Sequence, residues 1–147
     1  MTVLMNDGAF LKKGYYISAD KALLDKEAIY RFLKEESYWS QTLTPEKFER
    51  AIDNSMCFGV YKDDELAGFA RVITDKANFA YICDVFILTK YRRQGLSKWL
   101  IQTITQHTDL QELRRWMLAT ADAHGLYKQF GFTEISKPER WMEIYRP

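Results

Sequence analysis

Three apolar, aromatic and β-branched segments follow one another between Met56 and Leu88 and limit the folds open to this chain. The first two, residues 56–62 and 66–74, are separated by the polar sequence DDE, which is typical of a hairpin turn. The third segment, residues 79–88, is long and rich in strand-forming residues, so we expect it near the centre of a sheet. Consecutive strands joined by short turns predict an antiparallel core.

Helices are expected on both sides of these strands along the chain. Asp20 precedes the first helix as an N-cap, and Thr44 and Pro45 begin the second. Threonine accepts hydrogen bonds from the free N–H groups of a first turn, and proline suits the first helical position. The expected helices cover residues 21–37, 44 to at least 52, about 96–107, and 122–130.

Four further strands are expected, at residues 14–18, 114–120, 133–136 and 141–145. The resulting element order is β-α-α-β-β-β-α-β-α-β-β. Hairpins come first and strand–helix–strand crossovers follow. This order predicts one α+β domain over residues 1–147, with a twisted, mixed and mostly antiparallel sheet covered by helices on both faces.

Composition excludes several classes of function. The chain has 21 basic and 20 acidic residues, a balance that argues against nucleic acid as a general partner. Cys57 and Cys83 lie in apolar segments without metal-ligand spacing to His107 or His124, so we expect no metal site. Buried reduced thiols favour a cytoplasmic protein. No secretory signal or membrane association is expected, because Asn6 interrupts the N-terminal sequence and no later segment is long and apolar enough to span a bilayer.

The sequence YRRQGLS, residues 91–97, lies between the central strand and a helix. The first N–H groups of a helix lack internal acceptors, and the helix dipole adds partial positive charge there. Gly95 has no Cβ and lets the backbone approach a bulky anion, while Arg92 and Arg93 add attraction. These features predict a site for phosphate or pyrophosphate. The alternative is an exposed charged turn.

Two motifs resemble those of the GNAT superfamily of N-acetyltransferases. Residues 92–97 resemble the pyrophosphate loop, R/Q-x-x-G-x-G/A, with Ser97 where glycine or alanine is usual. Residues 123–132, AHGLYKQFGF, are similar to the second signature, A-x-x-L-Y-x-x-x-G-F. The expected order of helices and strands agrees with that family along the whole chain.

The resemblance implies that acetyl-coenzyme A binds as a co-substrate between the strands at residues 81–88 and 114–120. It implies that the backbone near Val85, Phe86 and Ile87 pairs with the pantetheine arm, although core packing is also expected of Val85 and Ile87. The pyrophosphate would lie on Arg92, Arg93, Gln94, Gly95, Leu96 and Ser97. Thr120 stands where the family often has an asparagine that contacts the cofactor, so one hydroxyl hydrogen bond is expected there.

Tyr127 and Asp84 are the candidate catalytic residues. The resemblance implies that Tyr127 is the general acid, because a phenol of ordinary pKa, about 10, can protonate the departing thiolate. The alternative is that Tyr127 only packs against the cofactor. Asp84 interrupts an apolar strand, and a buried carboxylate is costly unless paired. Two roles are open for Asp84: it binds or deprotonates the amine, or it forms a salt bridge with Arg71. His107 and His124 are weaker candidates for the base.

The family builds its acceptor pocket from the first two helices, their connecting loop and the last strands. The resemblance therefore places Glu35, Glu36, Tyr38, Trp39 and Trp141 around the acceptor. Acidic and aromatic side chains suit a cationic amine. The expected function is acetyl transfer from acetyl-coenzyme A to a primary amine of a small molecule or peptide, by direct attack. A non-catalytic acyl-coenzyme A sensor or scaffold is the alternative, and a homodimer is compatible with either.

Overall fold

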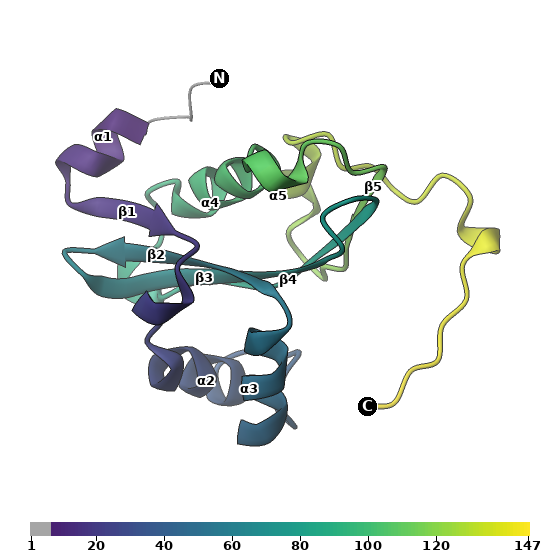
Figure 1. Cartoon of the computed structure of the whole chain (residues 1–147), viewed down its shortest axis with the longest axis horizontal. Helices are drawn as coiled ribbons and strands as arrows, with labels where there is room; N and C mark the ends of the chain where they lie inside the picture. Colours follow the sequence, from purple (N-terminus) through teal and green to yellow (C-terminus); the bar gives the residue numbers. More distant parts are fainter. Residues whose placement is uncertain (1–6) are drawn as a thin grey trace.

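The computed structural model describes residues 7–147 and contains a five-stranded sheet with helices on both faces (Figure 1). The strands are β1 (Tyr15–Ser18), β2 (Met56–Lys62), β3 (Glu65–Thr74), β4 (Phe79–Ile87) and β5 (Arg115–Leu118). The α-helices are α1 (Asp7–Lys12), α2 (Lys26–Glu35), α3 (Pro45–Asp53), α4 (Leu96–Thr105) and α5 (His124–Lys128). Short 3-10 helices cover Lys21–Leu23, Thr89–Tyr91, Thr108–Leu110 and Pro138–Arg140. This architecture confirms the expected α+β class.

The strands lie in the order β1-β2-β3-β4-β5. The first three pairings are antiparallel, and β4 and β5 are parallel, joined by a crossover that contains α4. Asp63 and Asp64 form the hairpin turn between β2 and β3, and both have positive φ. Two left-handed residues in a two-residue turn match the twist of the flanking strands. The DDE hairpin expected from the sequence is therefore confirmed.

The core has two layers, one on each face of the sheet. Helices α1, α4 and α5 cover one face, and α2 and α3 cover the other (Figure 1). On the first face the buried side of α4 packs on the sheet through Leu96, Trp99, Leu100, Ile101 and Ile104. On the second face, α2 and α3 pack on Phe69 and Phe86 through Ile29, Phe32, Leu33, Phe48 and Ile52.

The helix expected over residues 21–37 is two separate elements, which corrects that prediction. Asp20 caps the 3-10 helix, and Leu24 is extended. Asp25 then caps α2, since its side chain accepts a hydrogen bond from the Ala28 N–H at 3.1 Å. Two aspartates five positions apart each cap a helix here, and the extended Leu24 separates the two helices.

The two closing strands expected at residues 133–136 and 141–145 are wrong. After α5 the chain runs along the outer side of β5, turns at the 3-10 helix Pro138–Arg140, and leaves the sheet (Figure 1). Within the described part of the chain, β5 is therefore an edge strand.

The expectation of no secretory signal falls partly on residues 1–6, which lie outside the described residues. Between residues 7 and 147, no helix has the length and apolar character needed to cross a membrane.

Candidate active site

A β-bulge in β4 opens the sheet between its two parallel strands. Arg71 of β3 faces Cys83, but Phe69 faces Phe86, so two residues of β4 lie opposite Ala70 alone. One of the two, Asp84, has a φ of 53°. A bulge bends its strand and increases its twist. As a result, β4 and β5 pair only as far as Ile82 and Leu118, and then separate.

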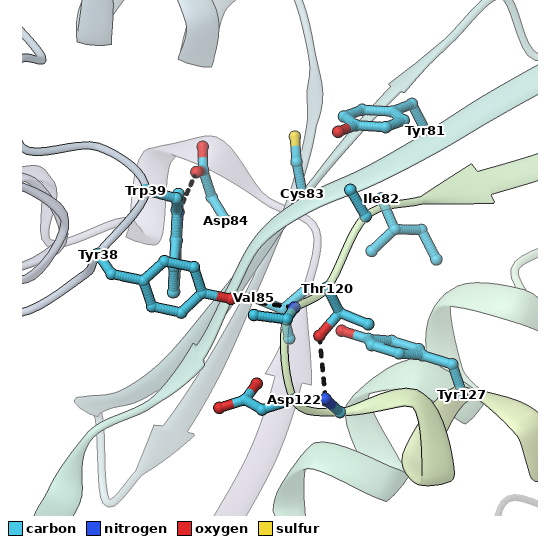
Figure 2. Close-up of a pocket in the computed structure, with 13 residues that line it drawn as sticks. Tyr38, Trp39, Tyr81, Ile82, Cys83, Asp84, Val85, Thr120, Asp122 and Tyr127 are labelled. Atoms are coloured by element: carbon cyan, nitrogen blue, oxygen red, sulfur yellow. Dashed lines mark hydrogen bonds between the residues drawn. The ribbon is translucent and has the colours of Figure 1, made fainter. Parts of the chain in front are cut away.

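A cavity of about 520 Å³ lies where β4 and β5 separate (Figure 2). This volume falls in the range of small-molecule sites. Residues 81–85 of β4 form one wall, and residues 119–123, between β5 and α5, form another. The remaining lining comes from Tyr38, Trp39 and Tyr127.

The loop after α2 spans this opening. The Trp39 indole N–H donates to Asp84 Oδ1 on β4 at 2.8 Å. The Tyr38 hydroxyl accepts a hydrogen bond from the Ala121 N–H, at 3.3 Å, on the β5 side. The two rings pack edge to face, 5.0 Å apart. The Tyr38–Trp39 loop therefore contacts both walls of the cavity.

Asp84 forms an ion pair with Arg71, the alternative partner expected from the sequence. Arg71 Nε lies 2.8 Å from Asp84 Oδ2, and the two side chains are only 17% and 11% exposed, respectively. Arg71 also donates to Ser55 Oγ at 3.0 Å. Both oxygens of Asp84 therefore have partners, one from Arg71 and one from Trp39. A role of Asp84 toward the amine stays a prediction.

Tyr127, in α5, is 7% exposed and borders the cavity. Figure 2 shows its hydroxyl pointing into the opening on the side of Thr120. Burial raises the pKa of Tyr127 to about 12, so the phenol stays protonated at neutral pH. The Thr120 hydroxyl accepts from the Ala123 N–H at 3.1 Å and thereby orders the turn that leads into α5.

The loop between β4 and α4 has the geometry of an anion site. Arg93 and Gly95 both adopt left-handed φ values, 66° and 87°. Gly95 is the N-cap of α4, and no side chain caps that helix end. A cavity of about 330 Å³ is lined by Arg92, Arg93 and residues 95–98 of this loop, together with Ile87, Tyr91 and Leu126; Gln94 does not line it. Free N–H groups and basic side chains beside such a cavity suit a phosphate group.

Two of the expected loop residues also hold the loop in shape. Arg92 Nε donates to the Ile87 carbonyl at 2.7 Å. The Gln94 amide donates to the Tyr91 carbonyl at 3.0 Å and accepts from the Tyr15 hydroxyl at 3.1 Å. These bonds connect the loop to β4 and to β1, so its backbone is positioned before any ligand arrives.

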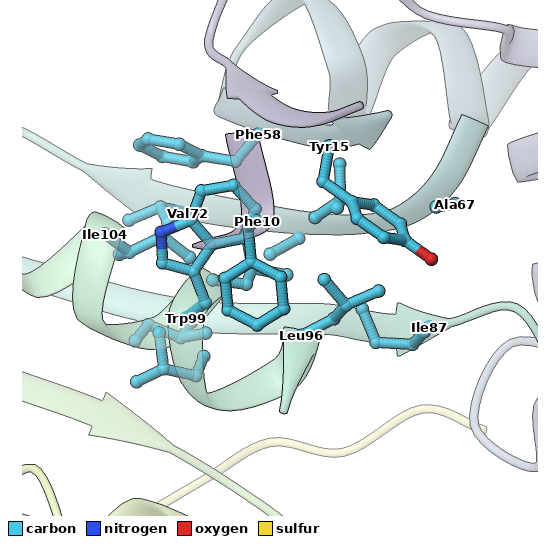
Figure 3. Packing of buried hydrophobic residues seen from close by; sticks show 14 of the residues in the cluster. Phe10, Tyr15, Phe58, Ala67, Val72, Ile87, Leu96, Trp99 and Ile104 are labelled. Atoms are coloured by element: carbon cyan, nitrogen blue, oxygen red, sulfur yellow. The ribbon is translucent and has the colours of Figure 1, made fainter. Parts of the chain in front are cut away.

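Helix α1, which the sequence did not reveal, fixes the start of α4. Phe10 stacks on Trp99 with ring centroids 4.5 Å apart, and Leu96 lies beside them (Figure 3). Tyr15 meets the Phe10 ring edge-on at 6.1 Å. A six-residue helix has too few turns to show an apolar period, so its sequence carries little signal.

The structure brings most, but not all, of the expected site residues together. Val85 and Ile87 face the α4 side of the sheet, and Phe86 stacks on Phe32 on the opposite side at 3.9 Å. Beyond Ile82, the described part of β5 provides no partner for the edge of β4. The residues gathered around the opening are Tyr38, Trp39, Asp84, Val85, Thr120 and Tyr127.

Three of the expected acceptor-site residues lie elsewhere. Glu35 and Glu36 are exposed at the end of α2 and do not line the cavity. The Trp141 ring lies 4.8 Å from the guanidinium of Arg115, at the start of β5. Sequence reasoning missed Tyr81 and Asp122, which do line the cavity. The sequence carried no signal for Tyr81, because the bulge at Asp84 and Val85 breaks the alternation that would relate Tyr81 to the predicted residue Val85.

The remaining titratable candidates lie outside the reacting geometry or are held protonated. His107 caps a 3-10 helix by accepting from the Asp109 N–H, and His124 is exposed at the start of α5. Burial raises the pKa of the Cys57 thiol to about 11 and that of the Cys83 thiol to about 12. Across residues 7–147, no group of three or more histidine, cysteine or acidic side chains could hold a metal ion.

Comparison with known proteins assigns the family. The profile of the acetyltransferase (GNAT) family matches residues 26–132. A GNAT-family protein from Xanthomonas campestris is 46% identical, with a TM-score of 0.88 over 90% of this chain and 94% of the other. A protein of Gibberella zeae, named as an acetyltransferase, is 30% identical over 77% of this chain and 75% of its own.

A more distant structure shares the fold. It comes from Clostridium acetobutylicum, was solved with acetyl-coenzyme A, and is 13% identical, with a TM-score of 0.63 over 89% of this chain and 94% of the other. An identity of 13% shows a shared fold alone. The family is therefore assigned from the profile match and from the relative that is 46% identical. The bulged β4, the open parallel strand pair and the two sequence motifs occur together in this chain. The chain belongs to the GNAT family of acetyltransferases.

Proposed function

We propose that this protein transfers an acetyl group from acetyl-coenzyme A to a primary amine by direct attack. One observation carries the proposal: Tyr127 lies on the wall of the cavity between β4 and β5, and β4 leads from this cavity into the loop at residues 92–95, before α4. A ligand with a thioester, an extended arm and a pyrophosphate fits this arrangement. The thioester would lie beside Tyr127, the arm along β4 and the pyrophosphate on the loop before α4. When bound, acetyl-coenzyme A supplies an activated acyl group.

The binding residues follow from the backbone geometry. Among the described residues, β5 does not pair with the edge of β4 at Val85, Phe86 and Ile87. The Ile87 carbonyl accepts from Arg92, and the remaining edge can pair with an extended amide-containing arm. The left-handed loop at Arg93 and Gly95 directs backbone N–H groups of the first turn of α4 toward an anion. In this proposal, Arg92 to Ser97 hold the pyrophosphate, and Thr120 contributes one hydroxyl.

Direct attack is favoured by the state of the two thiols. Cys57 and Cys83 are held protonated, because burial raises their pKa values to about 11 and about 12. A thiol rather than a thiolate is a weak nucleophile, which argues against an acyl-cysteine intermediate. Tyr127 then has the role of proton donor to the departing sulfur, since its hydroxyl faces the cavity and is protonated.

The amine would enter beside the Tyr38–Trp39 loop. Two aromatic rings and the carboxylates of Asp84 and Asp122 lie on this side of the cavity. Aromatic faces and acidic groups attract an ammonium ion. Because Arg71 already neutralises Asp84, Asp122 is the less compensated of the two carboxylates. Within residues 7–147, Asp122 takes part in no ion pair.

The test is thiol release from acetyl-coenzyme A with a panel of primary amines that includes polyamines, aminoglycosides and peptides. We expect amine-dependent release of thiol and an acetylated product in the mass spectrum. Calorimetry with acetyl-coenzyme A on the same preparation provides the comparison. Tight binding without release for any amine would instead support the acyl-coenzyme A sensor.

A further inference from the structure

A basic cavity lies at the start of β5. It has a volume of about 340 Å³, which falls in the range of small-molecule sites. Of the described residues that line it, Arg115, Lys137 and Arg140 are cationic and none is acidic; Ser136 and Trp141 complete the lining. The whole chain is nearly neutral, with 21 basic and 20 acidic residues, so the cavity is a local concentration of positive charge.

The three cations of this cavity have no counter-ion within residues 7–147, where none of them takes part in an ion pair. Glu139, in the turn that carries two of them, is exposed and does not line the cavity. Glu134 lines the adjoining cavity instead, together with Arg115. Like charges gathered in this way repel one another, so an anion that binds between them relieves the repulsion.

The cations are held in position by the fold. Arg115 pairs with Phe79 in the sheet, and its guanidinium lies 4.8 Å from the centre of the Trp141 ring. A guanidinium stacked on a ring still directs its N–H groups outward in its own plane. The Arg140 N–H donates to the Lys137 carbonyl at 3.0 Å, so a closed turn brings these two side chains together. The cavity is therefore formed by a strand end and a hydrogen-bonded turn.

The cavity is separate from the anion loop before α4. Strands β4 and β5 are parallel, and Arg115 pairs with Phe79 at the start of β4. The anion loop follows the other end of β4, beyond Ile87. Eight positions along a strand correspond to roughly 25 Å. One pyrophosphate group therefore cannot occupy both places, and the basic cavity would take a second anion.

We propose that this cavity binds the phosphate group of a small organic phosphate. Three cations match a phosphate monoester, which carries close to two negative charges at neutral pH, better than a singly charged carboxylate. The planar guanidinium groups of Arg115 and Arg140 suit paired hydrogen bonds to phosphate oxygens. The Trp141 ring provides a surface for the organic part of the ligand. This site does not depend on the proposed acetyl transfer.

NMR of isotope-labelled protein tests the binding on the unmodified chain. The four tryptophans have separate indole N–H groups, and Trp141→Phe identifies the signal that belongs to the cavity. The probes are phenyl phosphate and benzoate, which share a ring and differ in charge. We expect phenyl phosphate to shift the Trp141 signal to saturation. Benzoate should bind there about tenfold more weakly, because it offers fewer charge-assisted hydrogen bonds.

Inorganic phosphate distinguishes an organic ester from the free ion. It should bind more weakly than phenyl phosphate, because it has no ring to contact Trp141. Equal affinities for these two probes would overturn the assignment to an organic phosphate. An unshifted Trp141 signal, or equal affinities for phenyl phosphate and benzoate, would overturn the site itself. Backbone signals of residues 92–97 report separately on any binding at the loop before α4.

Two neighbouring arginines provide matched variants. Arg115→Gln removes a charge that lines the cavity, whereas Arg114→Gln removes an exposed charge that does not line it. Arg115→Gln should weaken phenyl phosphate binding at Trp141 by about tenfold, and Arg114→Gln should leave it unchanged. Lys137→Gln should also weaken binding about tenfold while the contact between Arg115 and Trp141 remains, so it tests the charge apart from that contact. Unchanged affinity of the Lys137→Gln variant would contradict the proposal.

Discussion

At the residue scale, the hydroxyl of Tyr127 has the clearest expected effect. Tyr127→Phe removes one oxygen and keeps the ring that packs against Phe132. If the phenol protonates the departing thiolate, turnover should fall by roughly 10²–10⁴-fold, with little change in acetyl-coenzyme A affinity. Steady-state kinetics and calorimetry on the same preparation measure the two quantities.

Tyr16→Phe is the matched control for Tyr127→Phe. It also removes a tyrosine hydroxyl, here one bonded to Asp64 on the surface and outside the cavity. The control should keep normal turnover. Near-normal turnover of Tyr127→Phe would instead show that Tyr127 only packs in the site.

The ion pair between Asp84 and Arg71 should contribute to stability. Asp84→Asn keeps the side-chain shape, and asparagine tolerates the left-handed φ of 53° found there. Removing one charge leaves Arg71 buried without its counter-ion, which should lower the free energy of unfolding by about 3 kcal/mol. Urea unfolding measures this loss.

The exposed pair of Glu49 with Lys26 provides the comparison for Asp84. Because these side chains are 51% and 41% exposed, Glu49→Gln should change stability by less than about 1 kcal/mol. A stable Asp84→Asn variant that binds acetyl-coenzyme A but loses rate with the amine would contradict the structural role. That result would favour the role of Asp84 toward the amine.

Gly95 combines a conformational and a binding requirement. Its φ of 87° disfavours any side chain, so Gly95→Ala should destabilise the protein by about 1–2 kcal/mol. Gly95→Glu adds bulk and negative charge at the anion site and should abolish acetyl-coenzyme A binding in calorimetry. Gly125→Ala, in α5 with no atom within 4 Å of the added Cβ, should leave stability unchanged or raise it. Unchanged affinity in a folded Gly95→Glu variant would rule out the loop as the pyrophosphate site.

At the scale of elements, the spacing of β3 and β4 sets the geometry of the proposed cofactor site. Gly68 of β3 lies against β4, where an added Cβ would come within 2.8 Å of the Phe86 carbonyl oxygen and close to the Ile87 side chain. Gly68→Ala should therefore push the strands apart and cost about 1–3 kcal/mol. It should also weaken acetyl-coenzyme A binding, because residues 85–87 provide the backbone edge.

Thermal melting and calorimetry measure the two effects of Gly68→Ala. Gly8→Ala, in α1, has no atom within 4 Å of the new methyl group and is the matched control. Wild-type stability of Gly68→Ala would mean that β4 accommodates the methyl group without moving.

The sequence correctly predicted elements that depend on residues close together in the chain, such as capping residues and short strand-forming segments. Strand β2 has the expected limits, and Thr44 and Pro45 begin α3 as expected. The split between Lys21–Leu23 and α2 was missed, because Asp20 and Asp25 are equally good caps and only tertiary packing selects both. Helix α1 was missed because its main support is the contact of Phe10 with α4, far away in the sequence.

The closing strands show the limit of pattern-based prediction. Residues 141–145 have strand-forming side chains, but a strand exists only when a neighbour accepts its hydrogen bonds. Similarly, the motif identified Tyr127, whereas the place of Trp141 depended on the path of the chain after Pro138. The local motif therefore identified Tyr127, which lines the candidate site, whereas the expectation that Trp141 lies in the acceptor pocket was wrong.

At the scale of the whole molecule, the fold buries three titratable groups whose charged forms are anionic, Cys57, Tyr61 and Tyr127, and partly buries a fourth, Cys83. Burial is the main cause of a raised pKa for each: about 11 for Cys57 and about 12 for Cys83, Tyr61 and Tyr127. They belong to both faces of the sheet and to the cavity. Their ionisation is therefore coupled to unfolding of the molecule as a whole.

This coupling predicts a loss of stability in alkali. Below about pH 7 these groups are protonated in both the folded and the unfolded chain, so they add no pH dependence. Above that pH, the unfolded chain releases its protons first, at the ordinary thiol and phenol pKa values, while the folded chain retains them up to pH 11–12. A pKa difference of one corresponds to roughly 1.4 kcal/mol, so the free energy of unfolding should fall steeply between pH 9 and pH 12.

Tyr61→Phe distinguishes this linkage from a general effect of alkali. The Tyr61 hydroxyl is buried and has no hydrogen-bond partner among the described residues, so its removal should be neutral or slightly stabilising at pH 7. The same change removes one ionisable group, so the variant should lose stability less steeply than the wild type above pH 10. Urea unfolding at a series of pH values from 7 to 11 measures both curves. Parallel curves for the two proteins would show that Tyr61 does not contribute to the alkaline transition.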